Sequence, residues 1–158
     1  MTDIAVLPAA LQSIRCNHLL VLELDIKAVQ RIGTDIVVGV VGGGRFEGTR
    51  LRGRVLDGGS DWQRVMPDGT VLLECRIVLE TAEGELIAMT YQGVRSGPAE
   101  VLARLARGAE VRADEYYLRI APLFRTQSPN HAWLNKVVAI GAGQRLSTGP
   151  IYNVFEVL

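Results

Sequence analysis

Asp61 is the strongest candidate in this chain for a residue that moves a proton. It stands in the segment Asp57-Gly58-Gly59-Ser60-Asp61-Trp62-Gln63, directly before the large aromatic side chain of Trp62. Gly58 and Gly59 adopt positive φ angles without strain, so they predict a tight turn just before both side chains. Binding groups are often displayed at such turns on a rigid scaffold. The segment therefore predicts an acid and an aromatic ring displayed together at the edge of a binding site.

Charged and aromatic side chains also recur at alternate positions of several predicted strands. Glu74 and Arg76 share one face of a strand, as do Tyr117 and Arg119, and Arg54 repeats the pattern on an earlier strand. These side chains either coat the outside of the molecule or surround a ligand in its interior. Inside, a carboxylate needs a cationic partner, because burial alone raises its pKa. Periodicity by itself favours the external coat.

His131 is a second candidate for acid/base chemistry. It lies in the segment Ser128-Pro129-Asn130-His131, where proline and asparagine predict a loop that enters a strand. Histidine titrates near neutral pH, so His131 could serve as a general base. The simpler interpretation is a surface histidine on a loop.

Other motifs that carry chemistry are missing from the sequence. The only two histidines, His18 and His131, lie far apart, and no C-x-x-C or H-E-x-x-H spacing occurs, so we predict no metal site. The triple glycine 42–44 lacks the lysine and the following helix of a phosphate loop, and it is better interpreted as a bend or bulge in a strand. No G-x-S-x-G surrounds a serine. We therefore predict neither a cofactor nor nucleophilic hydrolysis.

Composition narrows the class of protein further. The 158 residues suit one domain, 1–158, and 17 basic residues balance 17 acidic ones without a basic tract. A chain of this kind predicts no nucleic-acid or membrane partner. Met1-Thr2-Asp3 shows no cationic region before an apolar core, so we expect no secretory signal. Cys16 and Cys75 are then reduced thiols, and we expect a cytoplasmic location.

The elements that must position these residues are mostly strands. The clearest spans 70–81, where apolar side chains alternate with polar ones. Strands are also predicted over 19–26, 35–41, 45–48, 51–56, 86–93, 115–121, 136–140 and 151–158. One short helix is expected near residues 98–107, because Pro98 and Glu100 open it and Gly108 ends it. The pattern predicts an all-β fold, a closed antiparallel β-barrel of about 8–10 strands. Pairing of the first and last strands would close it.

Several segments together resemble an uncharacterised bacterial and fungal family known as domain of unknown function 3237, or uncharacterised protein family 0311. The resemblance is carried first by Asp57-Gly58-Gly59-Ser60-Asp61-Trp62-Gln63, and it spans nearly the whole chain. It continues through Asp68-Gly69, Leu73-Glu74-Cys75-Arg76, Tyr91-Gln92-Gly93-Val94-Arg95, Tyr116-Tyr117-Leu118-Arg119, Pro122-Leu123-Phe124-Arg125-Thr126 and Trp133-Leu134-Asn135-Lys136. The family implies a compact antiparallel β-barrel that forms dimers or higher oligomers, and no agreed activity. Cys75 and Ile77 depart from its pattern.

The resemblance shifts the interpretation of the polar side chains towards a shared cavity. Its characteristic residues are largely polar or aromatic, whereas a family held together by folding alone would share apolar core positions. We expect Asp61 to act as acid or base, and Arg76 or Arg119 to stabilise an enolate or phenolate oxygen. The expected ligand-binding residues are Trp62, Glu74, Tyr117, His131, Trp133, Asn135 and Arg54.

The sequence thus predicts a cofactor-independent isomerase, cyclase or lyase that acts on a small apolar or aromatic carbonyl compound. Two alternatives remain open. A carrier or sensor would use the same cavity without chemistry, and a structural or interaction protein would fill its barrel with side chains. If Glu74, Arg76 and Arg119 all face bulk water, both cavity hypotheses, the enzyme and the carrier, lose their basis.

Overall fold

The strands of this protein form one antiparallel sheet. The computed structural model describes residues 3–158, and within that range the sheet has nine strands. They are β1 (Cys16–Ile32), β2 (Ile36–Glu47), β3 (Arg52–Val55), β4 (Gly59–Val65), β5 (Val71–Thr81), β6 (Leu86–Ser96), β7 (Tyr117–Arg125), β8 (Val138–Arg145) and β9 (Pro150–Val157). The helical segments are η1 (Ile4–Val6), α1 (Ala9–Gln12), α2 (Ala99–Ala106), η2 (Ala113–Glu115) and η3 (Pro129–Lys136).

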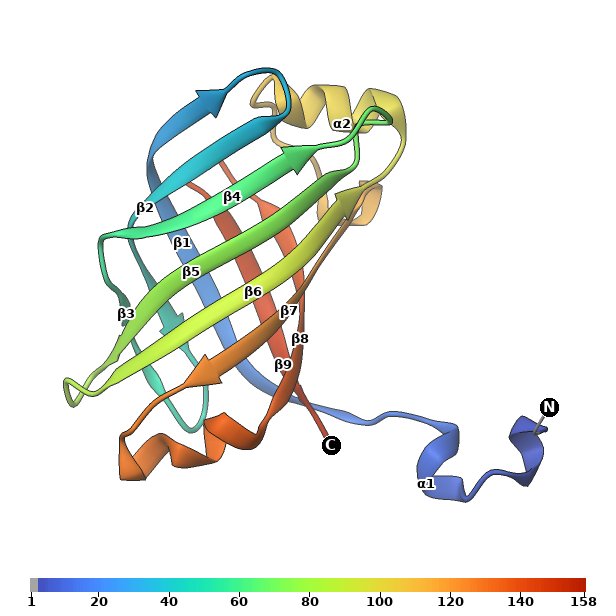
Figure 1. The fold of residues 1–158 in the computed structure, drawn as a ribbon, viewed down its shortest axis with the longest axis vertical. Helices are drawn as coiled ribbons and strands as arrows, with labels where there is room; N and C mark the ends of the chain where they lie inside the picture. The colour runs from blue at the N-terminus through green and yellow to red at the C-terminus, as the bar shows by residue number, and fades with distance from the viewer. Residues whose placement is uncertain (1–2) are drawn as a thin grey trace.

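The sheet closes on itself into a barrel (Figure 1). Neighbours pair in the order β1-β2-β4-β5-β6-β7-β8-β9, and β9 returns to pair with β1. The short β3 is an extra strand that bridges the far ends of β2 and β5. The expected closed antiparallel barrel is therefore confirmed, and so is the expected pairing of its first and last strands. Each strand of the ring thus pairs on both sides, although β7 and β8 pair only where Arg119 and Ile120 face Ala142 and Gly141.

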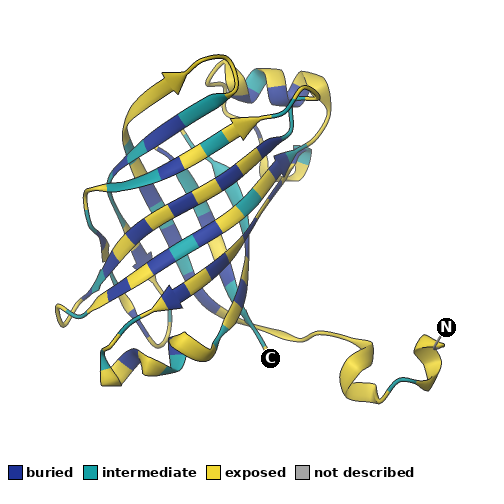
Figure 2. Cartoon of the chain, in the orientation of Figure 1, coloured by how far each residue is buried: buried dark blue, intermediate teal, exposed yellow. Residues whose placement is uncertain are grey.

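Strict alternation separates the inside of the barrel from the outside (Figure 2). On β5 the buried side chains are Val71, Leu73, Cys75, Ile77 and Leu79. The intervening side chains from Leu72 to Val78 are exposed. The same alternation on β6 and β7 fills the interior with apolar side chains, so the core of the molecule is the lumen of the barrel.

The segment around Asp61 differs from the sequence expectation. The turn is present, with Gly58 at a φ of +109°, but Gly59 already begins β4, which lies between β2 and β5. Successive side chains of a strand point to opposite faces. Asp61 is therefore only 2% exposed inside the barrel, whereas Trp62 is 46% exposed on its outer surface. The two side chains do not form one displayed pair.

The triple glycine lies in β2 where the pairing with β1 slips. Asp25 faces Gly43, but Ile26 faces Val41, so Gly42 is left without a partner. A Cβ atom on Gly44, whose φ is +142°, would overlap the carbonyl oxygen of Glu23. The predicted bulge is confirmed, and a bulge of this kind bends the strand that carries it.

Short helical segments lie at the two ends of the barrel. In Figure 1, α2 covers the end where β4 and β6 finish, and η3 lies at the opposite end. The helix predicted near 98–107 is confirmed as α2, which buries Val101, Leu102 and Leu105 against the barrel. Ahead of β1, the segments η1 and α1 bury no residue. No helix within residues 3–158 is long and apolar enough to cross a membrane.

Candidate functional site

Asp61 lies in a row of polar side chains that crosses the inner wall of the barrel. On neighbouring strands Asp61 faces Cys75, and Cys75 in turn faces Tyr91. The Tyr91 ring meets the ring of Tyr152 edge to face, with 5.4 Å between centroids. A carboxyl, a thiol and two phenols from β4, β5, β6 and β9 thus meet inside a lumen that is filled mostly by apolar side chains.

Burial tunes the proton affinity of this carboxyl group. It raises the pKa of Asp61 to about 7, against the opposing effects of the Arg95 charge and the Tyr91 hydroxyl. The Tyr91 hydroxyl is near enough to affect the pKa, yet neither it nor Asp61 Oδ1 has a hydrogen-bond partner. A group that titrates near neutral pH is suited to both accepting and returning a proton. Asp61 therefore has the properties of a general acid or base.

Two guanidinium groups approach the same part of the lumen. Arg95 points inward from β6, is 9% exposed, and leaves its Nε without a partner. Burial lowers the pKa of Arg95, and the neighbouring charge of Arg145 lowers it further. Arg145, at the end of β8, donates from Nη1 to the Leu105 carbonyl oxygen of α2 at 2.8 Å.

These groups line a cavity of about 500 Å³ at the α2 end of the barrel. Asp61, Arg95, Arg145 and Tyr152 all contribute to its walls. Its apolar lining includes Ile26, Val29, Val37, Leu73, Leu118 and Leu146. A volume of this size, lined by apolar side chains with a few convergent polar groups, is typical of sites for small organic molecules.

Most of the polar side chains expected around the ligand lie outside the barrel instead. Glu74 and Arg76 are exposed on the outer face of β5. Trp62, Glu74, Tyr117 and Arg119 do come together, but in an outer groove of about 900 Å³. The Arg119 guanidinium lies 4.7 Å from the centre of the Tyr117 ring there.

The strand period explains why these residues are separated from Asp61. The inner face of β5 carries Cys75, so the positions on either side of it must point outward. The wall of the barrel therefore separates Asp61 from Arg76 and Arg119. Because Glu74, Arg76 and Arg119 all face outward, the cavity that they were expected to form has no basis in the structure. The case for a site inside the barrel depends instead on Asp61 and the side chains beside it. Arg54 is also exposed, and it forms an ion pair with Glu80 at 2.9 Å.

The remaining expected residues lie at the opposite end of the barrel, in η3. Asn135 exchanges two hydrogen bonds with the backbone of Thr126, at 2.9 and 2.8 Å. Trp133 packs beneath the guanidinium of Arg50, 3.8 Å from its ring centre. Both contacts hold η3 against its neighbours, and neither side chain lines the cavity that contains Asp61.

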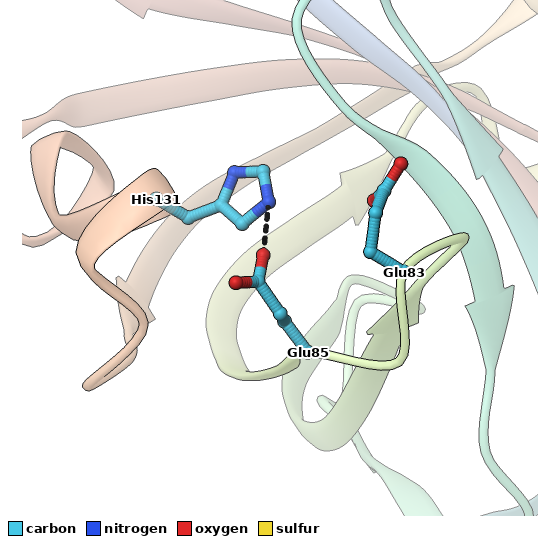
Figure 3. Close-up of side chains that lie close together, drawn as sticks. All are labelled: Glu83, Glu85 and His131. Carbon is cyan, nitrogen blue, oxygen red and sulfur yellow. Dashed lines mark ion pairs between the residues drawn. The ribbon is translucent and has the colours of Figure 1, made fainter.

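His131 is buried rather than exposed on a loop. It is 7% exposed, and its Nε2 lies 2.9 Å from Glu85 Oε2 in the turn between β5 and β6 (Figure 3). Glu83, Glu85 and His131 each offer a ligand atom within 4.8 Å of the others, so they could hold a divalent cation. Glu85 Oε1 is also bonded to Asn130 Nδ2 at 2.9 Å. These contacts fasten η3 to the β5–β6 turn without any ion.

Sequence reasoning missed the residues that share the lumen with Asp61. Tyr91 and Arg95 occur in a segment that resembles the family. The alternation that starts at Ile87 and Met89 places both side chains on the inner face of β6, so the sequence pattern alone could have identified them. Arg145 follows the glycines 141 and 143, which carry no side chain to mark the inner face.

Comparisons with known proteins agree with this architecture. The profile of a family described as "Protein of unknown function (DUF3237)" matches residues 14–157. The UPF0311 protein RPA1785 of Rhodopseudomonas palustris is 32% identical over 136 residues, which cover 85% of this chain and 88% of that protein. Its crystal structure superposes with a TM-score of 0.89 at 29% identity, covering 92% of this chain and 98% of the other.

Two further crystal structures share the fold. A beta-barrel like protein from Acinetobacter baumannii gives a TM-score of 0.78 at 36% identity and covers 92% of this chain and 97% of its own. An enzyme from Penicillium herquei gives a TM-score of 0.66 at 19% identity, over 92% of this chain and 95% of its own. At that identity the likeness concerns the fold alone.

Proposed function

The chain belongs to the DUF3237 family of proteins of unknown function, and we propose that it is a cofactor-independent acid/base enzyme. Its substrate is a small apolar or aromatic carbonyl compound that enters the barrel from the α2 end. The observation that carries the proposal is a buried carboxyl, Asp61, whose pKa of about 7 fits proton transfer at neutral pH. Structural carboxylates that are paired at a surface have lowered pKa values instead, as Asp57 does beside Lys27.

The proposed reaction is a proton transfer at the carbon next to the carbonyl group. The Asp61 carboxylate takes a proton from this carbon, and the bonding electrons move onto the carbonyl oxygen to form an enolate or phenolate. Arg95 and Arg145 donate hydrogen bonds to that oxygen, in the role that the sequence assigned to Arg76 or Arg119. The protonated Asp61 then returns the proton to another carbon, or to a leaving group, which gives an isomerase, cyclase or lyase.

The lumen supplies the remaining requirements of such a reaction. Apolar walls formed by side chains such as Leu73 and Leu118 accommodate a hydrophobic body beside the carbonyl. Burial also keeps neighbouring nucleophiles neutral, because it raises the pKa values of both Cys75 and Tyr91. Asp61 is then the group of this inner row that changes its charge near neutral pH.

Deuterium exchange tests the proposal without knowledge of the natural substrate. The protein is incubated in D₂O with a panel of aryl alkyl ketones, and deuterium at the carbon next to the carbonyl is measured by mass spectrometry. We expect catalysed exchange with at least one ketone, and its loss in Asp61→Asn with folding and ketone binding retained. The matched control is Asp57→Asn, which removes a surface carboxylate and should leave exchange unchanged. Exchange that persists in Asp61→Asn would rule out the assignment.

A carrier or sensor is the second candidate. The same cavity favours it as well, because Arg95, Arg145 and the apolar walls could hold a small molecule without any proton transfer. Ketones that bind in the lumen without any Asp61-dependent exchange would identify this function.

A further inference from the structure

The cavity that contains Asp61 carries an excess of positive charge. Its titratable lining residues include one carboxyl, Asp61, and three guanidinium groups, those of Arg31, Arg95 and Arg145. The whole chain has 17 basic and 17 acidic residues, so this imbalance belongs to the site and not to the composition. Among residues 3–158, none of the three arginines forms an ion pair with a carboxylate.

Two of these cations lie where an unpaired charge is costly. Arg95 is 9% exposed and has no partner for Nε, and its pKa falls because of burial and then because of the charge of Arg145. Removing a guanidinium group from water costs free energy unless an anion or several hydrogen bonds replace the water. The half-titrated carboxyl of Asp61 offers at most one negative charge to both groups.

Arg145 is held at the wall of the cavity by two hydrogen bonds. Its Nη1 donates to the Leu105 carbonyl oxygen and its backbone N–H donates to the Tyr116 hydroxyl, each at 2.8 Å. A guanidinium group has five N–H donors in a fixed fork, so most remain available to an anion. A carboxylate suits two such forks better than a neutral oxygen does.

We propose that the cavity selects oxo acids, which are carbonyl compounds that carry a carboxylate next to an apolar or aromatic body. Arg95 and Arg145 share the carboxylate and the carbonyl oxygen, and the carbon beside the carbonyl faces Asp61. The inference rests on the proposed function, because it assumes that this cavity is where the substrate binds. Small anions without an apolar body leave the walls formed by Leu73 and Leu118 uncovered.

Calorimetry with a matched pair of probes tests the selection. Phenylpyruvate carries the carboxylate, whereas benzyl methyl ketone keeps the ring and the carbonyl and lacks the charge. At neutral pH we expect phenylpyruvate to bind at least about tenfold more tightly, because charged groups in low dielectric interact strongly. Arg145→Met should remove most of this preference, because phenylpyruvate loses a charged partner whereas the neutral ketone loses at most one hydrogen bond to its carbonyl oxygen. Arg119→Met, which removes a guanidinium from the outer face, is the control and should keep the preference.

Failure of this inference and failure of the proposed function give different results. Equal affinity for the two probes, or a preference that survives both Arg145→Met and Arg95→Met, overturns the selection of oxo acids. If the neutral ketone nevertheless exchanges deuterium through Asp61, the enzyme assignment stands alone. If phenylpyruvate binds through Arg145 without exchange, the anion site stands and the barrel is a carrier.

Discussion

At the scale of single residues, Asp61 connects the proposed chemistry to a cost in stability. Its pKa is about 7 in the folded protein, against an ordinary value of 3.8. Between these values the folded protein binds a proton that the unfolded chain has released. The free energy of unfolding therefore falls as the pH rises from about 4 to about 7 and then levels off. A shift of this size corresponds to about 4 kcal/mol.

The first prediction is that Asp61→Asn is more stable than the wild type above neutral pH. The amide cannot ionise, so the free energy of unfolding of the variant does not fall between pH 4 and pH 7. At pH 8 it should exceed that of the wild type by up to about 4 kcal/mol. Urea unfolding of both proteins between pH 4 and pH 8 measures the difference directly. Asp57→Asn should instead be less stable than the wild type at neutral pH, because it loses the ion pair with Lys27 that lowers the pKa of Asp57. A constant difference between Asp61→Asn and the wild type across this range would contradict the raised pKa.

Residue-scale placement was only partly predictable from the sequence. The sequence placed Asp61 on a turn at the rim of a cavity, whereas the structure places it on a strand inside the barrel. The strand β4 was missed because its residues, Gly59 to Val65, include few of the β-branched side chains that mark strands. Pairing with both β2 and β5 overrides this weak propensity. Arg119 lies between the apolar Leu118 and Ile120, so local alternation already favoured its outward position.

At the scale of elements, the sequence predicts the middle of each core strand better than its ends. The middles were predictable because apolar side chains alternate there with polar ones, as they do along β5. Their ends were not, since β1 extends to Ile32 and β8 to Arg145 through segments whose pattern is broken by glycine or charge. Both extensions are paired in local hairpins, Ile32 with Ile36 and Arg145 with Pro150, so strand pairing overrides the weak pattern at these ends.

The second prediction concerns Gly44, near the slip in the pairing of β1 with β2. An alanine there would combine a φ of +142° with an overlap on the Glu23 carbonyl oxygen, so we expect Gly44→Ala to lower the free energy of unfolding by at least about 3 kcal/mol. Gly84→Ala is the matched control, because Gly84 has a φ of +85° with no atom within 4 Å of the added Cβ. It should cost only about 1 kcal/mol. If urea unfolding gave the same loss in free energy of unfolding for Gly44→Ala and Gly84→Ala, the backbone would have moved to relieve the overlap at residue 44.

At the scale of the whole molecule, the barrel presents an apolar groove on its outer surface. Its lining combines exposed aromatic and aliphatic side chains with charges of both signs: Trp62, Leu72, Val94, Tyr117 and Ile140 with Arg64, Glu74 and Arg119. A two-fold symmetric interface brings the same patch of two copies together, so a patch that contains both signs can match itself. The family resemblance also implies oligomers.

The third prediction is that this groove joins two copies of the chain. We expect a dimer in sedimentation velocity at micromolar concentration, and Leu72→Glu should convert it to a monomer by burying an unpaired charge. The control Leu86→Glu changes an exposed leucine outside the groove and should leave the dimer intact. A wild-type protein that stays monomeric at all concentrations, or a dimer unaffected by Leu72→Glu, would assign the groove to something else.

The hydrogen bond between Arg145 and α2 connects ligand binding in the cavity with the stability of this helix. The same guanidinium lines the cavity and holds the last turn of the helix that covers it, through the Leu105 carbonyl oxygen. A molecule that drew Arg145 towards itself would weaken this hydrogen bond and with it the local stability of α2. Thermodynamic linkage would then require that a change in the stability of α2 alters the affinity for that molecule by the same factor. Amide hydrogen exchange along residues 99–108 would then serve as an occupancy signal, readable before any product is identified.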